Sequence, residues 1–93
     1  MADLMEAMQL QIPSPNPFTT VLNVPYVIGK AGSHKVDIVF SDMVGRTIDT
    51  YRTENTQGEY TYTWYPKALQ RGVYLVSLYV DGKLMQTVKV IRR

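Results

Sequence analysis

The sequence contains no cysteine, and it has a single histidine, His34. The first absence excludes disulfide bonds and thiolate metal sites. The second leaves no histidine pair for a zinc site and no partner pattern for a catalytic triad. Unbroken apolar runs reach only about four residues, as in residues 73–76, whereas a membrane-spanning helix needs about 18. These absences predict a soluble globular domain that does not span a membrane and binds no cofactor or metal.

Clusters of one charge are also scarce. The net charge is +2 and the isoelectric point about 9.0, but the basic residues are scattered except for the pair Arg92 and Arg93. Nucleic-acid-binding domains gather lysine and arginine on one face, so no nucleic acid partner is expected. The first ten residues lack the basic start and long apolar core of a secretory signal. If the protein is exported, this segment does not direct it.

Residues 1–12 are interpreted as a linker, as vector-derived sequence or as a short helix, with the folded domain at residues 13–93. Asp3 followed by Glu6 resembles the start of a helix. The apolar residues that would share one helical face are Met1, Leu4, Met5 and Met8. A helix of about eight residues is marginal alone, so both interpretations stay open.

Alternation with period two dominates from residue 19 onward, which indicates half-buried β-strands. In residues 58–64, the aromatic side chains of Tyr60, Tyr62 and Trp64 share one face, and this face is predicted to point inward. The run 73–80 is apolar on both faces and suits a central strand. The seven predicted strands are residues 10–12, 20–28, 34–40, 46–52, 59–64, 73–80 and 84–91.

Asp81 and Gly82 separate the last two strands and predict a two-residue type I′ hairpin turn. A chain of 93 residues supports one small core. Seven short alternating strands in such a chain predict an all-β fold, an antiparallel β-sandwich of immunoglobulin-like size, with a small barrel as the alternative.

No residue pattern indicates an enzyme. His34 opens a strand after a glycine turn and is interpreted as a structural residue. The carboxylates are spread over several strands and turns and are expected to be solvated; they are Asp37, Asp42, Asp49, Glu54 and Glu59. The segment "DMVGR", residues 42–46, has too few acids for a calcium loop and too few glycines for a phosphate loop. It is predicted to be a tight turn in which the Asp42 side chain accepts backbone N–H bonds and Gly45 takes a positive φ.

The segment "PSPNPF", residues 13–18, is predicted to be an extended lead-in to the following strand. Pro13, Pro15 and Pro17 fix φ, lack an N–H and push the preceding residues toward extended geometry. Phe18 is expected to pack under the edge of the sandwich. The prolines are expected to cap the sheet and to discourage strand addition there.

The order of these segments adds information. "PNPF" before a strand, then "DMVGR", "GEYTYTW", "RGVYLVSLYVDGK" and "TVKVIRR" together resemble the C-terminal sorting domain of type IX secretion cargo in Bacteroidetes-type bacteria. The residues that carry the resemblance are Pro15, Asn16, Pro17, Phe18, Asp42, Gly45, Arg46, Gly72, Tyr74, Gly82, Lys83, Lys89, Val90 and Ile91. Family members often carry consecutive lysines near the start of the last strand, where this chain has Gln86 and Thr87. The family fold is an immunoglobulin-like sandwich, in agreement with the strand count.

The resemblance implies a non-catalytic secretion signal that is covalently part of a larger cargo protein. Such a cargo crosses the inner membrane by a separate N-terminal signal, and its sorting domain is then recognised by outer-membrane components of the type IX translocon. A sortase-like peptidase usually removes the domain, and the cargo is released or anchored to a surface lipopolysaccharide. The implied location is the periplasm in transit, then the cell surface or the medium. The chain would then be an excised domain, with the cleavage point near or before residue 12.

The last hairpin is the hypothetical contact surface for the translocon, because a preformed strand edge presents a partner with a surface that is already ordered. The residues assigned to this contact are Lys83, Lys89, Val90, Ile91, Arg92 and Arg93. The alternative for this strand is a purely structural role in completing the core, and Val88 and Val90 are expected to be buried.

Two other functions stay open. One is a structural or adhesive immunoglobulin-like module of a surface protein. The other is a carbohydrate-binding module, which needs exposed coplanar aromatic side chains, here those of Tyr51, Tyr65 and Tyr79. The isolated domain could also pair through a free edge strand to form a homodimer.

Overall fold

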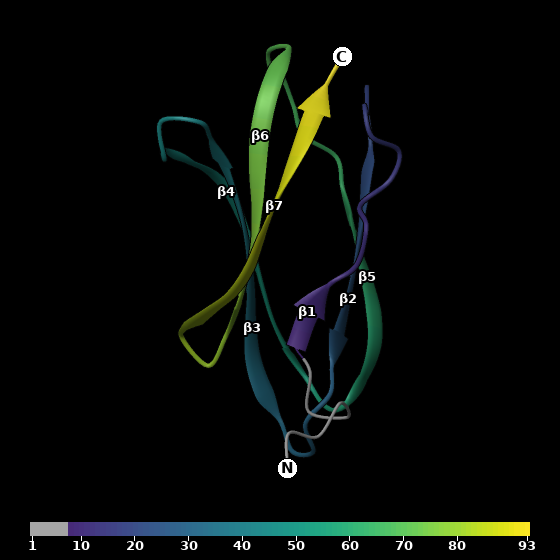
Figure 1. Ribbon diagram of the computed structural model, residues 1–93, viewed down its shortest axis with the longest axis vertical. Helices are drawn as coiled ribbons and strands as arrows, with labels where there is room; N and C mark the ends of the chain where they lie inside the picture. Colours follow the sequence, from purple (N-terminus) through teal and green to yellow (C-terminus); the bar gives the residue numbers. More distant parts are fainter. Residues whose placement is uncertain (1–7) are drawn as a thin grey trace.

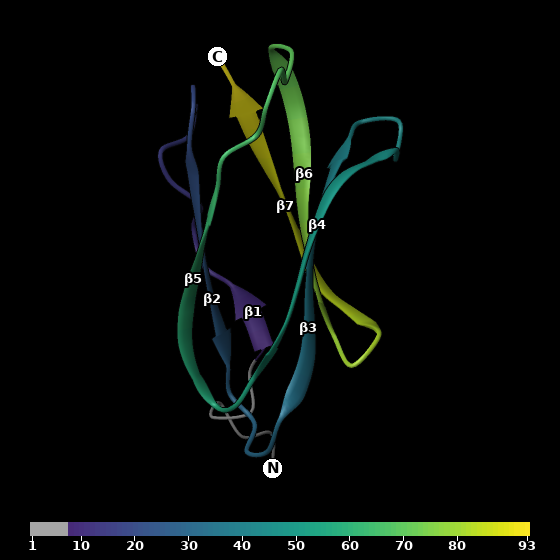
Figure 2. The same cartoon turned by 180° about the vertical axis from the view of Figure 1, so that it is seen from behind.

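A computed structural model describes residues 8–93 of the chain, which form seven strands and no helix (Figure 1). The strands are β1 (Met8–Leu10), β2 (Leu22–Ile28), β3 (His34–Asp42), β4 (Thr47–Asn55), β5 (Gly58–Trp64), β6 (Gly72–Val80) and β7 (Lys83–Arg92). They pair antiparallel in two sheets, with the orders β1-β2-β5 and β4-β3-β6-β7. The two sheets face one another as a sandwich (Figures 1 and 2), so the predicted all-β immunoglobulin-like fold is confirmed. In residues 8–93 no helical segment of membrane-spanning length and apolarity occurs.

The first strand lies two residues earlier than expected, at Met8–Leu10 instead of residues 10–12. It pairs with β2 from Met8 opposite Ile28 to Leu10 opposite Tyr26. Beyond Leu10 the β2 edge offers Pro25, whose carbonyl oxygen accepts a bond from the Gln11 N–H but which has no N–H to return. Paired structure therefore begins before residue 13. The rest of the expected linker or short helix, residues 1–7, lies outside the described residues.

The core is built by the alternation that the sequence shows. Along β3, Val36, Ile38 and Phe40 are fully buried, while the residues between them face outward or are half-buried. Trp64 closes β5, and its ring stacks on the ring of Phe40 from the other sheet, with centroids 3.9 Å apart and an interplanar angle of 15°. Phe18 adds a third ring, 5.9 Å from Trp64. The aromatic face of residues 58–64 points inward, as predicted.

β6 lies between β3 and β7, so the run that is apolar on both faces is a central strand, as predicted. The hairpin that follows has Asp81 and Gly82 as its two loop residues, with Val80 opposite Lys83. Their φ values of 52° and 83° are those of a type I′ turn, which the Asp-Gly pair favours. The pairing of β7 with β6 shifts between Leu78 and Tyr79, which is a β-bulge.

Candidate recognition surface

Four of the segments that carry the family resemblance meet at one end of the sandwich, although they span residues 15–93 of the sequence, whereas Gly82 and Lys83 lie in the hairpin at the other end. Asp42 of β3 lies opposite Tyr74 of β6, and Tyr74 lies opposite Val90 of β7. One step further, Gly72 lies opposite Arg92, which also bridges to Phe18. We call this end the motif end and define it by residues 15–18, 42–46, 72–74 and 91–93. In Figure 1 it is the upper end, where the C-terminus lies.

The lead-in segment, residues 13–18, is hydrogen-bonded to the end of β7. The Ile91 N–H donates to the Asn16 Oδ1 atom at 2.9 Å, the Phe18 N–H donates to the Ile91 carbonyl oxygen at 2.9 Å, and the Arg93 N–H donates to the Phe18 carbonyl oxygen at 2.8 Å. The Phe18 side chain is fully buried. Its expected packing under the sandwich edge is confirmed. In addition, the lead-in segment occupies the outer edge of β7 at residues 91–93, which the sequence did not indicate.

Residues 42–46 form the predicted tight turn. The Asp42 Oδ1 atom accepts bonds from the backbone N–H groups of Val44 (3.0 Å) and Arg46 (2.9 Å), and its Oδ2 atom accepts one from the Arg46 Nε atom at 2.8 Å. Gly45 has φ 91°, which an L-residue rarely adopts. Partial burial acts to raise the pKa of Asp42, but the hydrogen bonds from Arg46 and Val44 outweigh it and hold this pKa below its ordinary value. The acid is therefore ionised and fixes the orientation of Arg46.

The G-x-Y segment at the start of β6 anchors the connection from β5. The Tyr74 side chain is buried, and its hydroxyl donates to the Gln70 carbonyl oxygen at 2.6 Å. This bond holds residues 70–72 over the end of the sheet, next to the turn at residues 42–46. The G-x-Y spacing thus positions a loop of the motif end in addition to starting a strand.

The six residues assigned to translocon contact do not form one patch. Lys83 begins β7 and Arg92 ends it, so the ten-residue strand separates Lys83 from the terminal residues by about 30 Å. Val90 is fully buried and cannot touch a partner of the folded domain, which corrects its place in the contact set. Arg92 is half-buried, and its Nη1 atom donates to the Arg93 carbonyl oxygen. The exposed members at or next to the motif end are Lys89, Ile91 and Arg93.

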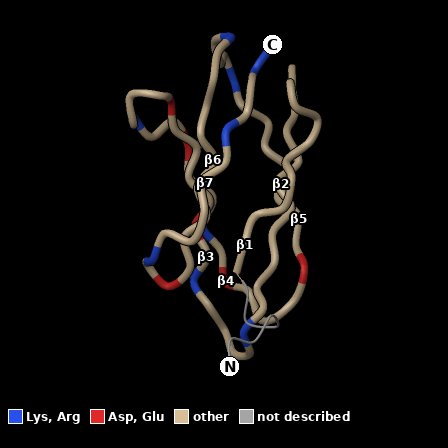
Figure 3. The backbone as a smooth tube through the Cα atoms, in the orientation of Figure 1, with Lys and Arg blue, Asp and Glu red and all other residues tan. Residues whose placement is uncertain are grey.

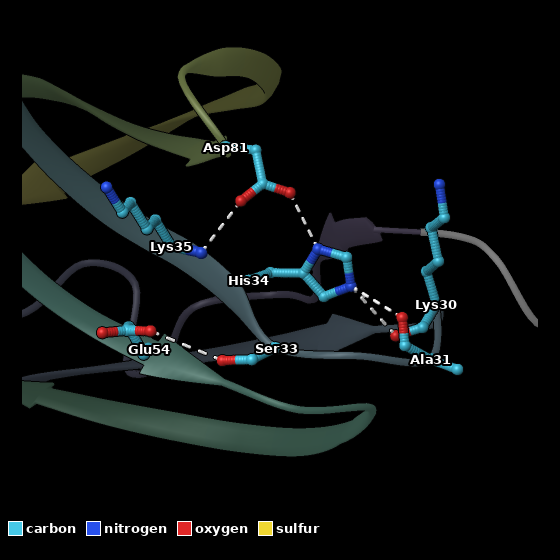
Figure 4. Close-up of polar contacts among 7 residues, drawn as sticks. All are labelled: Lys30, Ala31, Ser33, His34, Lys35, Glu54 and Asp81. Carbon is cyan, nitrogen blue, oxygen red and sulfur yellow. Dashed lines mark hydrogen bonds and ion pairs between the residues drawn. The ribbon is translucent and has the colours of Figure 1, made fainter.

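His34 is buried at the opposite end and ties two turns together (Figure 4). Its Nδ1 atom lies 2.8 Å from the Asp81 Oδ2 atom, and its Nε2 atom lies 3.2 Å and 3.1 Å from the carbonyl oxygens of Lys30 and Ala31. The Asp81 Oδ1 atom also accepts the Lys35 N–H at 3.0 Å. All partners of the ring are acceptors, so the doubly protonated imidazolium fits the site best. This arrangement supports the structural interpretation of His34.

The pair makes stability depend on pH. The hydrogen bond to Asp81 raises the pKa of His34 above its ordinary value of 6.5, against the opposing effect of burial, and the bond from His34 lowers the pKa of Asp81 below 3.8. Lys30 and Lys83 line the same hollow and are the other charged groups that face the pair. The stability that His34 contributes is complete below pH 6.5 and is lost as the pH rises through the raised pKa of His34. The stability that Asp81 contributes is present above pH 3.8 and is lost as the pH falls through the lowered pKa of Asp81.

We therefore expect the melting temperature to fall as the pH is raised from about 6 to about 9, because the imidazolium loses its proton. Calorimetric melting of the wild type and of the variants His34→Gln and Asp81→Asn measures this effect. Both variants should show a flatter curve in this range. Curves of equal slope for all three proteins would contradict the assignment.

The other candidate side chains do not assemble into a reactive centre. Asp49 is exposed, as expected, and also accepts a hydrogen bond from the Trp64 Nε1 atom at 3.0 Å. Glu54 lies 3.4 Å from the Ser33 hydroxyl, and Asp37 lies 3.9 Å from the Arg52 Nε atom. Among residues 8–93, no three acidic, histidine or cysteine side chains gather in an arrangement that could hold a metal ion.

The tyrosines considered for carbohydrate binding do not share a surface. The ring of Tyr51 stacks on the ring of Tyr62, with the centroids 3.9 Å apart. The pairing register places Tyr51 on the same inner face as the buried Leu78. Tyr79 is next to Leu78 in β6, so its side chain points to the outer face. Tyr65 is exposed beyond the end of β5. The coplanar platform that a carbohydrate-binding module needs is not formed.

Comparison with protein families matches residues 14–93 to the family described as the secretion system C-terminal sorting domain. No curated protein and no solved structure matches the chain. The match includes all the segments that converge at the motif end. The family comprises type IX secretion signals and is in general non-catalytic, and its members are tails of larger cargo proteins destined for the cell surface or the medium. This chain belongs to the family of C-terminal sorting domains of type IX secretion cargo.

Proposed function

We propose that the domain directs its cargo through the outer-membrane translocon of the type IX system and that the motif end is the surface that the translocon reads. The observation that supports this proposal is the meeting of four segments of the family pattern at one end of the sandwich. Core packing alone does not require exposed residues at that end, yet Ile91 is 44% exposed and Arg93 is also exposed.

The lead-in segment gives this surface a fixed shape. Its three hydrogen bonds to Ile91 and Arg93 hold the end of β7 in place. Because this surface is already ordered, the domain loses little conformational entropy when a partner binds. The three hydrogen bonds also occupy the edge of β7 where another strand would otherwise add. Recognition there uses the side chains of residues 91 and 93, not their backbone.

We further propose that a sortase-like peptidase removes the domain after transit through the periplasm and that it cuts before Met8. A peptidase requires an extended, accessible backbone, and from Met8 onward the backbone is repeatedly hydrogen-bonded: β1 pairs with β2, Gln11 bonds to Pro25, and Ser14 bonds to Asn23. The cargo is then released or joined to an anionic surface lipopolysaccharide.

The test fuses residues 8–93 to a periplasmic reporter and scores its appearance on the surface of hosts with and without the translocon. The double variant Ile91→Glu, Arg93→Glu replaces one apolar and one positively charged surface side chain with two negatively charged ones and leaves the core side chains unchanged. We expect surface display to fall at least tenfold, because burying or reversing one charge at an interface weakens binding by more than about 1.4 kcal/mol. The matched control is Lys83→Glu, Leu84→Gln at the other end of β7, which should be displayed like the wild type.

Circular dichroism melting of the purified domains separates a recognition defect from a folding defect. Equal display of both double variants, with both folded, would refute the motif end as the recognised surface. Display of the wild type that does not depend on the translocon would refute the sorting function itself.

A further inference from the structure

A groove of about 760 Å³ lies at the motif end, between the turn of residues 42–46 and the chain that leads into β6. Figure 2 shows both segments at the upper end, on either side of the start of β6. Apolar side chains of Met43, Val44, Ile48, Leu69 and Val73 line it. Its volume exceeds that of the hollow beside His34 and Asp81, which is about 390 Å³.

The apolar side chains of the turn make none of the hydrogen bonds that form it. Asp42 and Gly45 fix the conformation of the turn through hydrogen bonds and a positive φ, whereas Met43 is 57% and Val44 80% exposed. Ile48 on the adjoining strand is 39% exposed. Neighbouring exposed apolar side chains beside a groove are typical of interaction sites.

The charge around the groove is positive. Arg46 and Arg71 line it, and the side chain of Arg46 is 82% exposed although its Nε atom is bonded to Asp42. Asp42 is the one acid among the lining residues, and the turn and Arg46 already use both of its oxygens. Figure 3 shows further basic residues near this end, at the C-terminus and before β6. Guanidinium groups in such a setting pair with carboxylates.

We propose that this groove binds a peptide segment of a partner protein, with apolar side chains and at least one carboxylate side chain. The segment packs its apolar side chains on Met43 and Val44 and places its carboxylate at Arg71 or Arg46. The inference rests on the proposed function for one point, that the partner is a component of the export machinery.

The test is an NMR titration of the ¹⁵N-labelled domain, with ¹³C-labelled methionine methyls, against two end-blocked octapeptides. One peptide alternates valine with glutamate, and the other alternates valine with lysine. We expect the glutamate peptide to shift the Met43 methyl signal and the Val44 and Val73 amide signals. The lysine peptide should bind at least tenfold more weakly.

Two variants check the site. Arg71→Gln should weaken binding of the glutamate peptide at least fivefold, and Met43→Ser, Val44→Ser should abolish it, since both change exposed side chains and leave the fold intact. Leu84→Ser, Met85→Ser at the far hairpin is the matched control and should bind like the wild type. Absent or dispersed shifts, equal binding of both peptides, or equal binding by the Met43, Val44 variant would overturn the proposal. Peptide binding and translocon-dependent display are separate measurements, so either proposal can fail alone.

Discussion

Replacing Phe18 by alanine is expected to lower the free energy of unfolding by about 3–5 kcal/mol, because it empties a fully buried site. The Phe18 ring lies beside Trp64, which stacks on Phe40, so it belongs to the contact that joins the two sheets. Small domains are stable by about 5–15 kcal/mol, so the loss is a large share of the total. Urea unfolding followed by fluorescence measures it directly, since Trp64 is the only tryptophan and its ring centroid lies 5.9 Å from that of Phe18.

Two further variants test whether the loss comes from the cavity. Phe18→Leu keeps most of the volume and should cost less than about 1.5 kcal/mol. Tyr65→Ala removes an aromatic ring next to Trp64 in sequence, but Tyr65 is 71% exposed, so its loss should change stability by no more than about 0.5 kcal/mol. If Phe18→Ala proved no more costly than Tyr65→Ala, the lead-in segment would not be part of the core.

The fold was predictable because its signals are local. Alternation places Val36, Ile38 and Phe40 on one face without reference to any distant residue, and the Asp81-Gly82 pair fixes the geometry of its own hairpin. The turn at residues 42–46 follows the same rule, since the partners of Asp42 lie within four residues of it. The one misplaced strand, β1, has only three residues, too few for a pattern to locate it.

The candidate site was less predictable because it depends on contacts between residues far apart in the chain. Asn16 bonds to a residue 75 positions away, and the partner of His34 lies 47 positions away. Neither distance can be read from composition or spacing. The register of β6 with β7 was the one available signal, because counting back from the Asp81-Gly82 turn brings Gly72 near Arg92. The burial of Val90 followed from alternation, but the separation of Lys83 from the terminal residues required the length of β7 to be considered.

The same long-range contacts lead to a second large effect, at the opposite end of the sequence from Phe18. A chain that ends at Val90 loses the three hydrogen bonds that Ile91 and Arg93 make with the lead-in segment. At about 0.5–1.5 kcal/mol each, these bonds contribute about 2–4 kcal/mol. We expect the lead-in segment to detach locally, so that the Phe18 amide exchanges with solvent at least about 30-fold faster, which hydrogen exchange followed by NMR measures.

Graded variants divide this loss among its causes. Removal of Arg93 alone deletes one of the three bonds and should accelerate exchange of the Phe18 amide only modestly, and Asn16→Ala deletes only the bond to the Ile91 N–H. Deletion of the whole last strand is a poor test of recognition, because it also removes the buried Val90 side chain from the core. A Phe18 amide as protected in the shortened chain as in the full domain would show that the terminal residues do not hold the lead-in segment. In that case the motif end would lack the ordered edge on which its proposed recognition depends.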